Sequence, residues 1–169
     1  MNEDVTVVVC SCDKYEDAWE PFFRLFKDYH ADLSFSNPLV LNTETKQFQC
    51  NYLQVRTINY QKEATWSKRL HFVLSKINTP FVFLLLEDFF LQKDFDGNGF
   101  SLVMDYMRHN PDVGAMHMTP NGRFPEDATD MFLERKFDKL NITVTAVVWR
   151  KDFLEALLRD HETIWQFEW

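Results

Sequence analysis

The chain has 169 residues, 46% of them hydrophobic, and a net charge of −8 from 18 basic and 26 acidic side chains. Its length predicts a single domain over residues 1–169, and the acidic charge without a Lys- or Arg-rich block argues against a nucleic-acid partner. All four glycines (Gly97, Gly99, Gly114 and Gly122) follow residue 96, which excludes the glycine-rich first turns of P-loop and dinucleotide-binding proteins.

The chain begins with a strand and a helix. Residues 5–10 are apolar and mostly β-branched, which is typical of a strand buried on both faces. A helix is expected over residues 15–29, and because Pro21 lies inside that range we expect it to begin near Trp19 or Glu20.

Strands and helices continue to alternate along the rest of the chain. Strands are expected over residues 39–41, 52–58, 81–86, 112–118 and 142–149, and helices over residues 64–77, 100–108 and 151–159. This alternation predicts an α/β sheet that is covered by helices on both faces.

Two groups of polar residues directly follow strands of the predicted sheet. Ser11, Cys12, Asp13 and Tyr15 come after the first strand, and the pair Glu87 and Asp88 comes after the strand over residues 81–86. In α/β sheets, ligands bind at the carboxyl ends of the strands near a switch in strand order. The sequence therefore predicts a ligand site at this edge of the sheet.

The adjacent carboxylates of Glu87 and Asp88 admit two interpretations. Acidic side chains at the exit of a buried strand are costly unless they are solvated, paired or bound to a cation. One hypothesis is a site for Mg²⁺ or Mn²⁺ held against a diphosphate. The other is a turn that caps the next segment of the chain.

A second acidic stretch, from Asp94 to Asp105, matches the spacing of a calcium-binding EF-hand loop. Its surroundings argue against calcium, because the segment before it is strand-like and no second loop exists to pair with it. The alternative is a glycine-rich turn in which Asp96 or Asn98 caps the following helix.

Two further candidates lie on the helix over residues 64–77 and near Trp169. Arg69 could neutralise a diphosphate beside Trp66, or it could lie on a solvated helix face. Glu168 lies among aromatic residues, which would raise its pKa and suit a general base, or it could belong to a frayed, exposed terminus.

The sequence also bears on cellular location. The chain shows no signal peptide, and its longest apolar run, residues 81–86, is too short to span a bilayer. Three cysteines, an odd number, argue against a disulfide framework. We therefore expect a cytoplasmic protein with no transmembrane segment.

Four stretches together resemble bacterial nucleotide-sugar glycosyltransferases of the GT-A fold, which act on cell-surface polysaccharides. They are CSCDKYEDAW, WSKRL, FVFLLLEDFFL and VVWRKDFL…IWQFEW, and the resemblance extends over residues 5–169. It implies a mixed, mainly parallel sheet with helices on both faces. It also implies an inverting transfer of a sugar from a nucleoside diphosphate-sugar to a glycan or a lipid-linked sugar, which allows peripheral association with a membrane.

The resemblance assigns roles to individual residues. Ser11, Asp13 and Tyr15 would contact the base and ribose, and Trp66 and Arg69 would lie near the nucleotide and its diphosphate. Glu87 and Asp88 would form the motif that binds Mn²⁺ or Mg²⁺, and Glu168 would be the catalytic base that deprotonates the acceptor.

The chain departs from the family pattern at two places. The metal motif reads Glu87-Asp88-Phe89, so the second aspartate of Asp-x-Asp is missing and metal binding would be weaker or water-mediated. Family members also continue beyond the WQFE stretch, so we expect an acceptor-side segment to be lacking. These departures favour an alternative: a non-catalytic nucleotide- or calcium-binding module of the same fold. A nucleotidyltransferase fits less well, since its glycine-rich start is absent.

Overall fold

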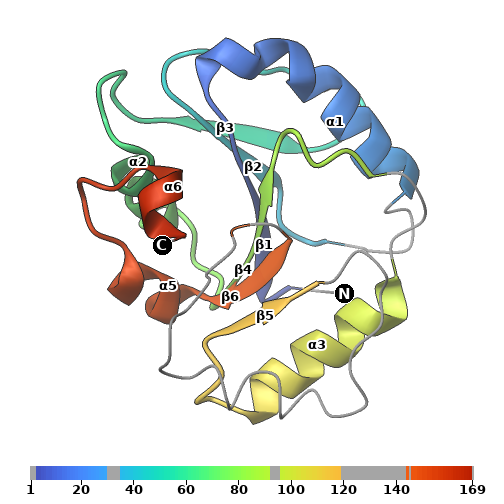
Figure 1. Cartoon of the computed structure of the whole chain (residues 1–169). Coiled ribbons are helices and arrows are strands. Elements are labelled where there is room, and N and C mark those ends of the chain that lie inside the picture. Colours follow the sequence, from blue (N-terminus) through green and yellow to red (C-terminus); the bar gives the residue numbers. More distant parts are fainter. Residues whose placement is uncertain (1–2, 30–34, 92–95, 119–143, 145, 169) are drawn as a thin grey trace.

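The computed structural model describes residues 3–29, 35–91, 96–118, 144 and 146–168. Six strands form one sheet in the order β3-β2-β1-β4-β6-β5 (Figure 1). The strands are β1 (Val5–Cys10), β2 (Leu39–Thr43), β3 (Val55–Asn59), β4 (Phe81–Leu86), β5 (Ala115–His117) and β6 (Val147–Arg150). The first four are parallel, whereas β6 is antiparallel to both β4 and β5. The predicted mixed, mainly parallel sheet is confirmed.

Helices cover both faces of this sheet, as predicted (Figure 1). The 3₁₀ turn η1 (Asp13–Tyr15) leads into α1 (Glu16–Tyr29), which packs on one face together with α3 (Gly97–His109). The other face carries α2 (Trp66–Leu74), α5 (Lys151–Leu157) and α6 (Ile164–Phe167). Because side chains alternate along a strand, β1 and β4 contribute to both cores.

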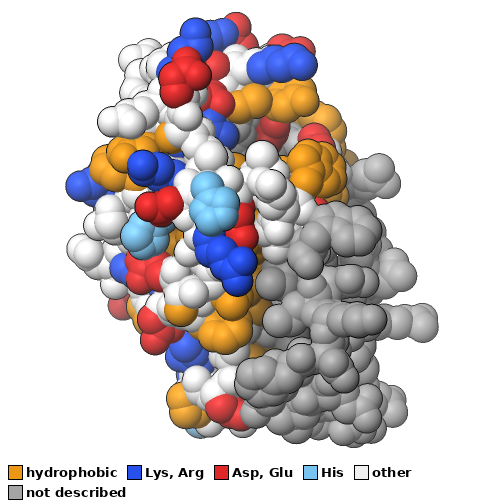
Figure 2. All heavy atoms as spheres, turned by 60° about the vertical axis from the view of Figure 1, so that its left-hand side comes forward, with side chains coloured by type: hydrophobic (Ala, Val, Ile, Leu, Met, Phe, Trp, Pro, Cys, Tyr) orange, Lys and Arg blue, Asp and Glu red, His pale blue; other side chains and the backbone are white. Residues whose placement is uncertain are grey.

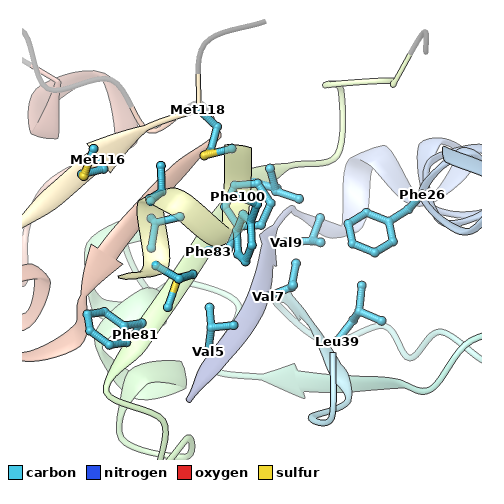
Figure 3. Close-up of a cluster of buried hydrophobic side chains, with 14 of the residues drawn as sticks. Val5, Val7, Val9, Phe26, Leu39, Phe81, Phe83, Phe100, Met116 and Met118 are labelled. Carbon is cyan, nitrogen blue, oxygen red and sulfur yellow. The ribbon is translucent and has the colours of Figure 1, made fainter. Parts of the chain in front are cut away.

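The core beneath α1 and α3 is rich in aromatic rings. Val5, Val7 and Val9 of β1 face this core, where Phe26 of α1 and Phe100 of α3 pack against the sheet (Figure 3). The opposite core takes the alternate residues of β1 and the apolar face predicted for the helix over residues 64–77. The observed helix is shorter, so Trp66, Leu70, Val73 and Leu74 lie on α2 and Ile77 follows it, and all five are buried.

The expected start of the first helix is wrong. α1 begins at Glu16, and Pro21 lies inside it rather than at its start. A proline in a helix interior removes one backbone hydrogen bond. Here the burial of Trp19, Phe22 and Phe23 against the sheet outweighs that loss.

Differences also occur near the end of the chain. The strand predicted over residues 112–118 is only Ala115–His117, and β6 is Val147–Arg150, with residues 142, 143 and 145 of its predicted range outside the described part. The short helix α6 was not predicted, although its capping box of Thr163 and Gln166 is a recognisable start signal. Four residues are too few to show helical periodicity.

Among the described residues, no helix is both long enough and apolar enough to cross a bilayer.

Candidate functional site

The parallel register brings the carboxyl ends of three strands together. Cys10 at the end of β1 is level with Asn42 of β2 and with Leu86 of β4. The order of the strands changes direction between β1 and β4, which is where α/β sheets form ligand crevices. The two polar groups predicted from the sequence, residues 11–15 and 87–88, therefore leave adjacent strands at one edge.

Ser11 is buried at this edge and interacts with several neighbouring elements. Its hydroxyl accepts a hydrogen bond from Nε1 of Trp19 at 2.7 Å and also interacts with the carboxylate of Glu87. Its backbone amide donates to the carbonyl of Asn42 at 2.9 Å. Ser11 thus connects β1 with α1, β2 and the end of β4.

Asp13 organises the loop that follows β2. Its carboxylate accepts hydrogen bonds from the amides of Thr45 and Lys46 at 3.0 and 3.1 Å, and from the Thr45 hydroxyl at 2.5 Å. Desolvation opposes ionisation, but these hydrogen bonds outweigh it and lower the pKa of Asp13 to about 2. Tyr15, two residues on, exposes 48% of its surface.

The loop held by Asp13 presents Glu44 to Arg69. The backbone amide of Asp13 and the Nη1 atom of Arg69 both donate to the Glu44 carboxylate. Arg69 is buried, and its Nε atom has no hydrogen-bond partner. Arg69 therefore lies beneath the site with its charge balanced by Glu44, whereas Lys68 on the same helix is exposed.

Trp66, the other nucleotide candidate on α2, is buried between β1 and the end of the chain. Its indole Nε1 atom has no hydrogen-bond partner, and its ring lies 5.3 Å from that of Phe167. Desolvation raises the pKa of Cys10 to about 12. Trp66 is therefore part of the wall that supports the site.

The two acidic residues after β4 lie in different environments. Asp88 is exposed to solvent, whereas Glu87 is buried, with only 7% of its surface exposed. Burial, helped by the negative charge of Asp88, raises the pKa of Glu87 to about 7 against the opposing effects of its backbone, Ser11 and Arg69. The pair is thus one buried carboxyl group beside one solvated carboxylate.

The described residues contain no group of three or more His, Cys, Asp or Glu side chains arranged to hold a metal ion. A cation here would need most of its ligands from a diphosphate and from water, with Asp88 as the exposed carboxylate. With one exposed carboxylate, the described residues at this edge do not form a complete cage for a metal ion.

Glu168 reaches the same edge from the end of the chain. Because β6 is antiparallel to β4 and Val147 pairs with Leu84, the residues before Val147 extend toward the carboxyl end of β4. Oε1 of Glu168 accepts a hydrogen bond from the amide of Val144 in this region at 3.0 Å. Glu168 is half-buried and bonded, which is not the frayed terminus that was its alternative.

The aromatic surroundings expected for Glu168 are formed only in part. Phe167 is buried against Trp66 and Trp149, with ring centroids 5.3 and 6.3 Å apart. Trp165 is 70% exposed, and Trp169 lies outside the described residues.

The described part of the EF-hand-like stretch, residues 96–105, does not form a calcium-binding loop. α3 begins at Gly97, the fourth of the twelve positions, so the fourth to the twelfth are helical. Oδ1 of Asp96 accepts from the amide of Gly99 at 2.9 Å, which is the capping role that was the alternative. Asp105 pairs with Arg108, and Asp94 lies outside the described residues.

Sequence reasoning missed Asn42 and Glu44. Asn42 is fully buried, donates from Nδ2 to the carbonyl of Ile58 at 3.3 Å, and leaves Oδ1 without a partner. Both residues follow the apolar run 39–41, so the rule that ligands gather after strands could have found them. The second strand was predicted to end at residue 41, whereas it continues to Thr43.

The face that carries α2 and α6 shows Lys, Arg, Asp and Glu side chains interspersed (Figure 2). The described side chains on this face form no continuous cationic patch of the kind that binds phosphate backbones.

The fold has a counterpart among solved structures. The crystal structure of S. aureus TarS, residues 1–349, is similar over 98% of this chain with a TM-score of 0.56 and 11% identity. The chain spans 53% of the length of that structure. No protein-family model and no curated protein sequence matches the chain. The structural likeness supports the predicted α/β fold.

Proposed function

We propose that the chain is a glycosyltransferase that moves a sugar from a nucleoside diphosphate-sugar to a hydroxyl group of an acceptor. The observation that carries this proposal is the convergence of Ser11, Asp13, Arg69, Asp88 and Glu168 on one edge of the sheet, at its switch in strand order. TarS, which shares the fold, is a glycosyltransferase of teichoic acid synthesis.

The donor nucleotide would bind where β1 ends. The exposed ring of Tyr15 offers a stacking face for a base, and the loop that Asp13 orders lies beside it. Arg69 supplies positive charge beneath the diphosphate. Because Glu44 neutralises Arg69 in the free protein, donor binding would redistribute this ion pair and engage the unpartnered Nε atom.

A divalent cation would be held by Asp88 together with the diphosphate and water. When bound, Mn²⁺ or Mg²⁺ neutralises charge that develops on the leaving diphosphate. Glu87 is less suited to direct ligation near neutral pH because its raised pKa keeps a large fraction of it protonated. Its hydrogen bond with Ser11 and its electrostatic interaction with Arg69 support a position on the donor side.

Glu168 is the proposed base of an inverting reaction. In an inverting displacement, the acceptor hydroxyl attacks from the side opposite the diphosphate and loses its proton to a carboxylate. Glu168 follows α6, a different element from those that carry Ser11, Glu87 and Arg69. Its hydrogen bond to Val144 gives the carboxylate a defined position.

The acceptor would be a glycan or a lipid-linked sugar, the latter reached by peripheral association with a membrane. Phe89 and Phe90, which directly follow Asp88, are 41% and 43% exposed. Exposed rings beside a hydroxyl-transfer site favour stacking against a sugar.

An assay that follows donor hydrolysis and sugar transfer separately tests this proposal. Wild-type protein with Mn²⁺ and a panel of uridine, guanosine, thymidine and cytidine diphosphate-sugars should consume one donor. Glu168→Gln should lower transfer by about 10²–10⁴-fold, the usual contribution of a general base. Asp96→Asn, which changes the carboxylate that caps α3, is the control and should leave the turnover rate unchanged.

The same assay separates the enzyme from a non-catalytic module of the same fold. Nucleotide binding with neither hydrolysis nor transfer would support the module. Full activity of Glu168→Gln would instead move the base to another residue.

A further inference from the structure

The end of the chain is bonded to the start of α2 rather than lying loosely on the surface. Residues 159–168, here termed the C-terminal segment, pass directly beside the first turn of α2 (Figure 1). Two hydroxyl side chains of that turn, Thr65 and Ser67, make the connection. The Thr65 hydroxyl, at the N-cap of α2, donates to the carbonyl of Asp160 at 2.5 Å.

Ser67 makes the larger share of this connection. Its hydroxyl lies 2.5 Å from the carbonyl oxygen of Arg159 and 3.0 Å from that of Glu162, and it accepts from the amide of Glu162 at 3.1 Å. The Ser67 amide donates to the Glu162 carbonyl at 3.2 Å as well. Ser67 is completely buried, so water cannot replace these bonds if the hydroxyl is lost.

This connection links the two halves of the proposed active site. Arg69, proposed to face the diphosphate, lies two residues after Ser67 on α2. Glu168, the proposed base, lies six residues after Glu162. The capped helix α6 lies between them, so the position of Glu162 determines where Glu168 lies. The Phe167 ring, packed on Trp66, adds an apolar contact between the same two elements.

We propose that Ser67 is a positioning residue that fixes Glu168 relative to Arg69 by holding the C-terminal segment against α2. The proposal rests on the proposed function for the role of Glu168, but the geometric claim stands by itself. Ser67 does not contact the substrate in this account. It sets the approach of the base to the acceptor, and misplacement of a reacting group by about 1 Å can cost about 10²-fold in rate.

The test compares Ser67→Ala with Thr79→Val. Thr79 is also buried, and its hydroxyl bonds Thr6 at 2.8 Å and the Phe81 carbonyl at 3.0 Å, at the opposite edge of the sheet. Both variants lose a buried hydroxyl, so the pair controls for general destabilisation. Thr65→Val, at a less buried position, supplies a second, milder perturbation of the same connection.

Hydrogen exchange gives the structural result without any substrate. In Ser67→Ala, the amides of Glu162, Phe167 and Glu168 should exchange at least about tenfold faster. The local opening that allows exchange costs less free energy in this variant, because the bonds of the Ser67 hydroxyl no longer have to be broken. The Val144 amide, which donates to Glu168, should follow them. Thr79→Val should leave all four rates near those of the wild type, and Thr65→Val should increase them by less than Ser67→Ala does.

Kinetics give the functional result. Ser67→Ala should lower kcat for sugar transfer by about tenfold or more while KM for the donor stays within about twofold, because the base moves and the donor site does not. Unchanged exchange at Glu168 and Val144 would overturn the inference whatever the activity. Faster exchange with undiminished transfer would overturn the link to Glu168. If the wild type transfers no sugar, the proposed function fails while the exchange data still decide the structural claim.

Discussion

The two edges of the sheet differ in how completely their polar groups are satisfied. At the amino edge, Thr79 bonds Thr6, and Arg150 donates to three backbone carbonyls, those of Met107, Asn110 and Val113. At the carboxyl edge, Asn42, Trp66 and Arg69 keep buried polar atoms without partners, and Glu87 keeps a buried carboxyl group. Elsewhere in the described part of the chain, one further buried atom lacks a partner, Nε1 of Trp149 on β6.

This difference separates groups that stabilise the fold from groups that are available for a ligand. Buried polar atoms without partners cost free energy, so a fold retains few of them. Such atoms are concentrated where β1 and β4 end. A ligand site requires polar groups of this kind, because they can form new contacts with a substrate. The open hollow at the amino edge, about 220 Å³ and lined by Gly114, Arg150 and Phe153 among others, has no comparable unsatisfied groups among its described lining residues.

The largest expected effect contrasts two arginines, one from each edge. Arg69→Met removes the cation from a buried pair and leaves Glu44 uncompensated, so it should lower the free energy of unfolding by about 3–5 kcal/mol. Arg108→Met breaks the more exposed pairs with Asp4 and Asp105 and should cost about 0–1 kcal/mol. Chemical denaturation of both variants measures the difference, and equal losses would contradict the contrast between the edges.

The second prediction concerns pH and Glu87. Its pKa of about 7 in the folded protein exceeds the ordinary value of 4.5, so between these values the folded state binds a proton that the unfolded state has released. Stability should therefore decline as pH rises from about 4.5 through 7, by at most about 3 kcal/mol.

Glu87→Gln should remove this decline and be more stable than the wild type at pH 8. Denaturation curves from pH 4 to 8, recorded with chelator present, test both statements. A wild-type profile that rises across this range and a variant with the same slope would show that Glu87 is ionised throughout.

A smaller effect is expected at the amino edge. A Cβ atom added at Gly114 would lie 2.3–2.5 Å from ring atoms of Phe153, so Gly114→Ala should cost about 1–3 kcal/mol. Phe153 is 41% exposed, and the double variant with Phe153→Ala should recover part of the loss because the clash is gone. Thermal unfolding of the three variants provides the test, and an additive double variant would locate the strain elsewhere.

The smallest effect should appear only in acid. The pKa of Asp13, lowered to about 2, means that its hydrogen bonds to the loop after β2 stabilise the protein above the ordinary value of 3.8 and are lost as pH falls through 2. Asp13→Asn should flatten the acid limb of the stability profile below pH 4. The wild-type and variant profiles should then converge near pH 2, and parallel profiles would show that Asp13 is not bonded in this way.

The sequence predicted the sheet well because its central strands are continuous apolar runs. β1 and β4 have the predicted bounds, and the rule that ligands gather after strands located Ser11, Asp13, Glu87 and Asp88 at one edge. The partners of these residues could not be predicted. The pairing of Arg69 with Glu44, 25 residues apart, depends on how α2 packs beside β2, and helical spacing does not encode that contact.

The different environments of Glu87 and Asp88 could not be predicted from the sequence either. Adjacent carboxylates look equivalent in a sequence, and only the tertiary fold buries one and leaves the other in water. Pro21 was misjudged for a related reason, because local propensity was given more weight than the burial of the aromatic face of α1.

The most direct test of the central claim is an NMR titration of the chain with uridine, guanosine, thymidine and cytidine diphosphates in the presence of Mg²⁺. One of them should bind with a Kd in the micromolar to millimolar range. It should shift the amide resonances of Ser11, Asp13, Thr45 and Lys46 at the carboxyl edge and leave those of Gly114 and Arg150 at the amino edge unchanged. If no diphosphate binds the folded protein, or if the shifts cluster around Gly114 and Arg150, the carboxyl edge is not a nucleotide site.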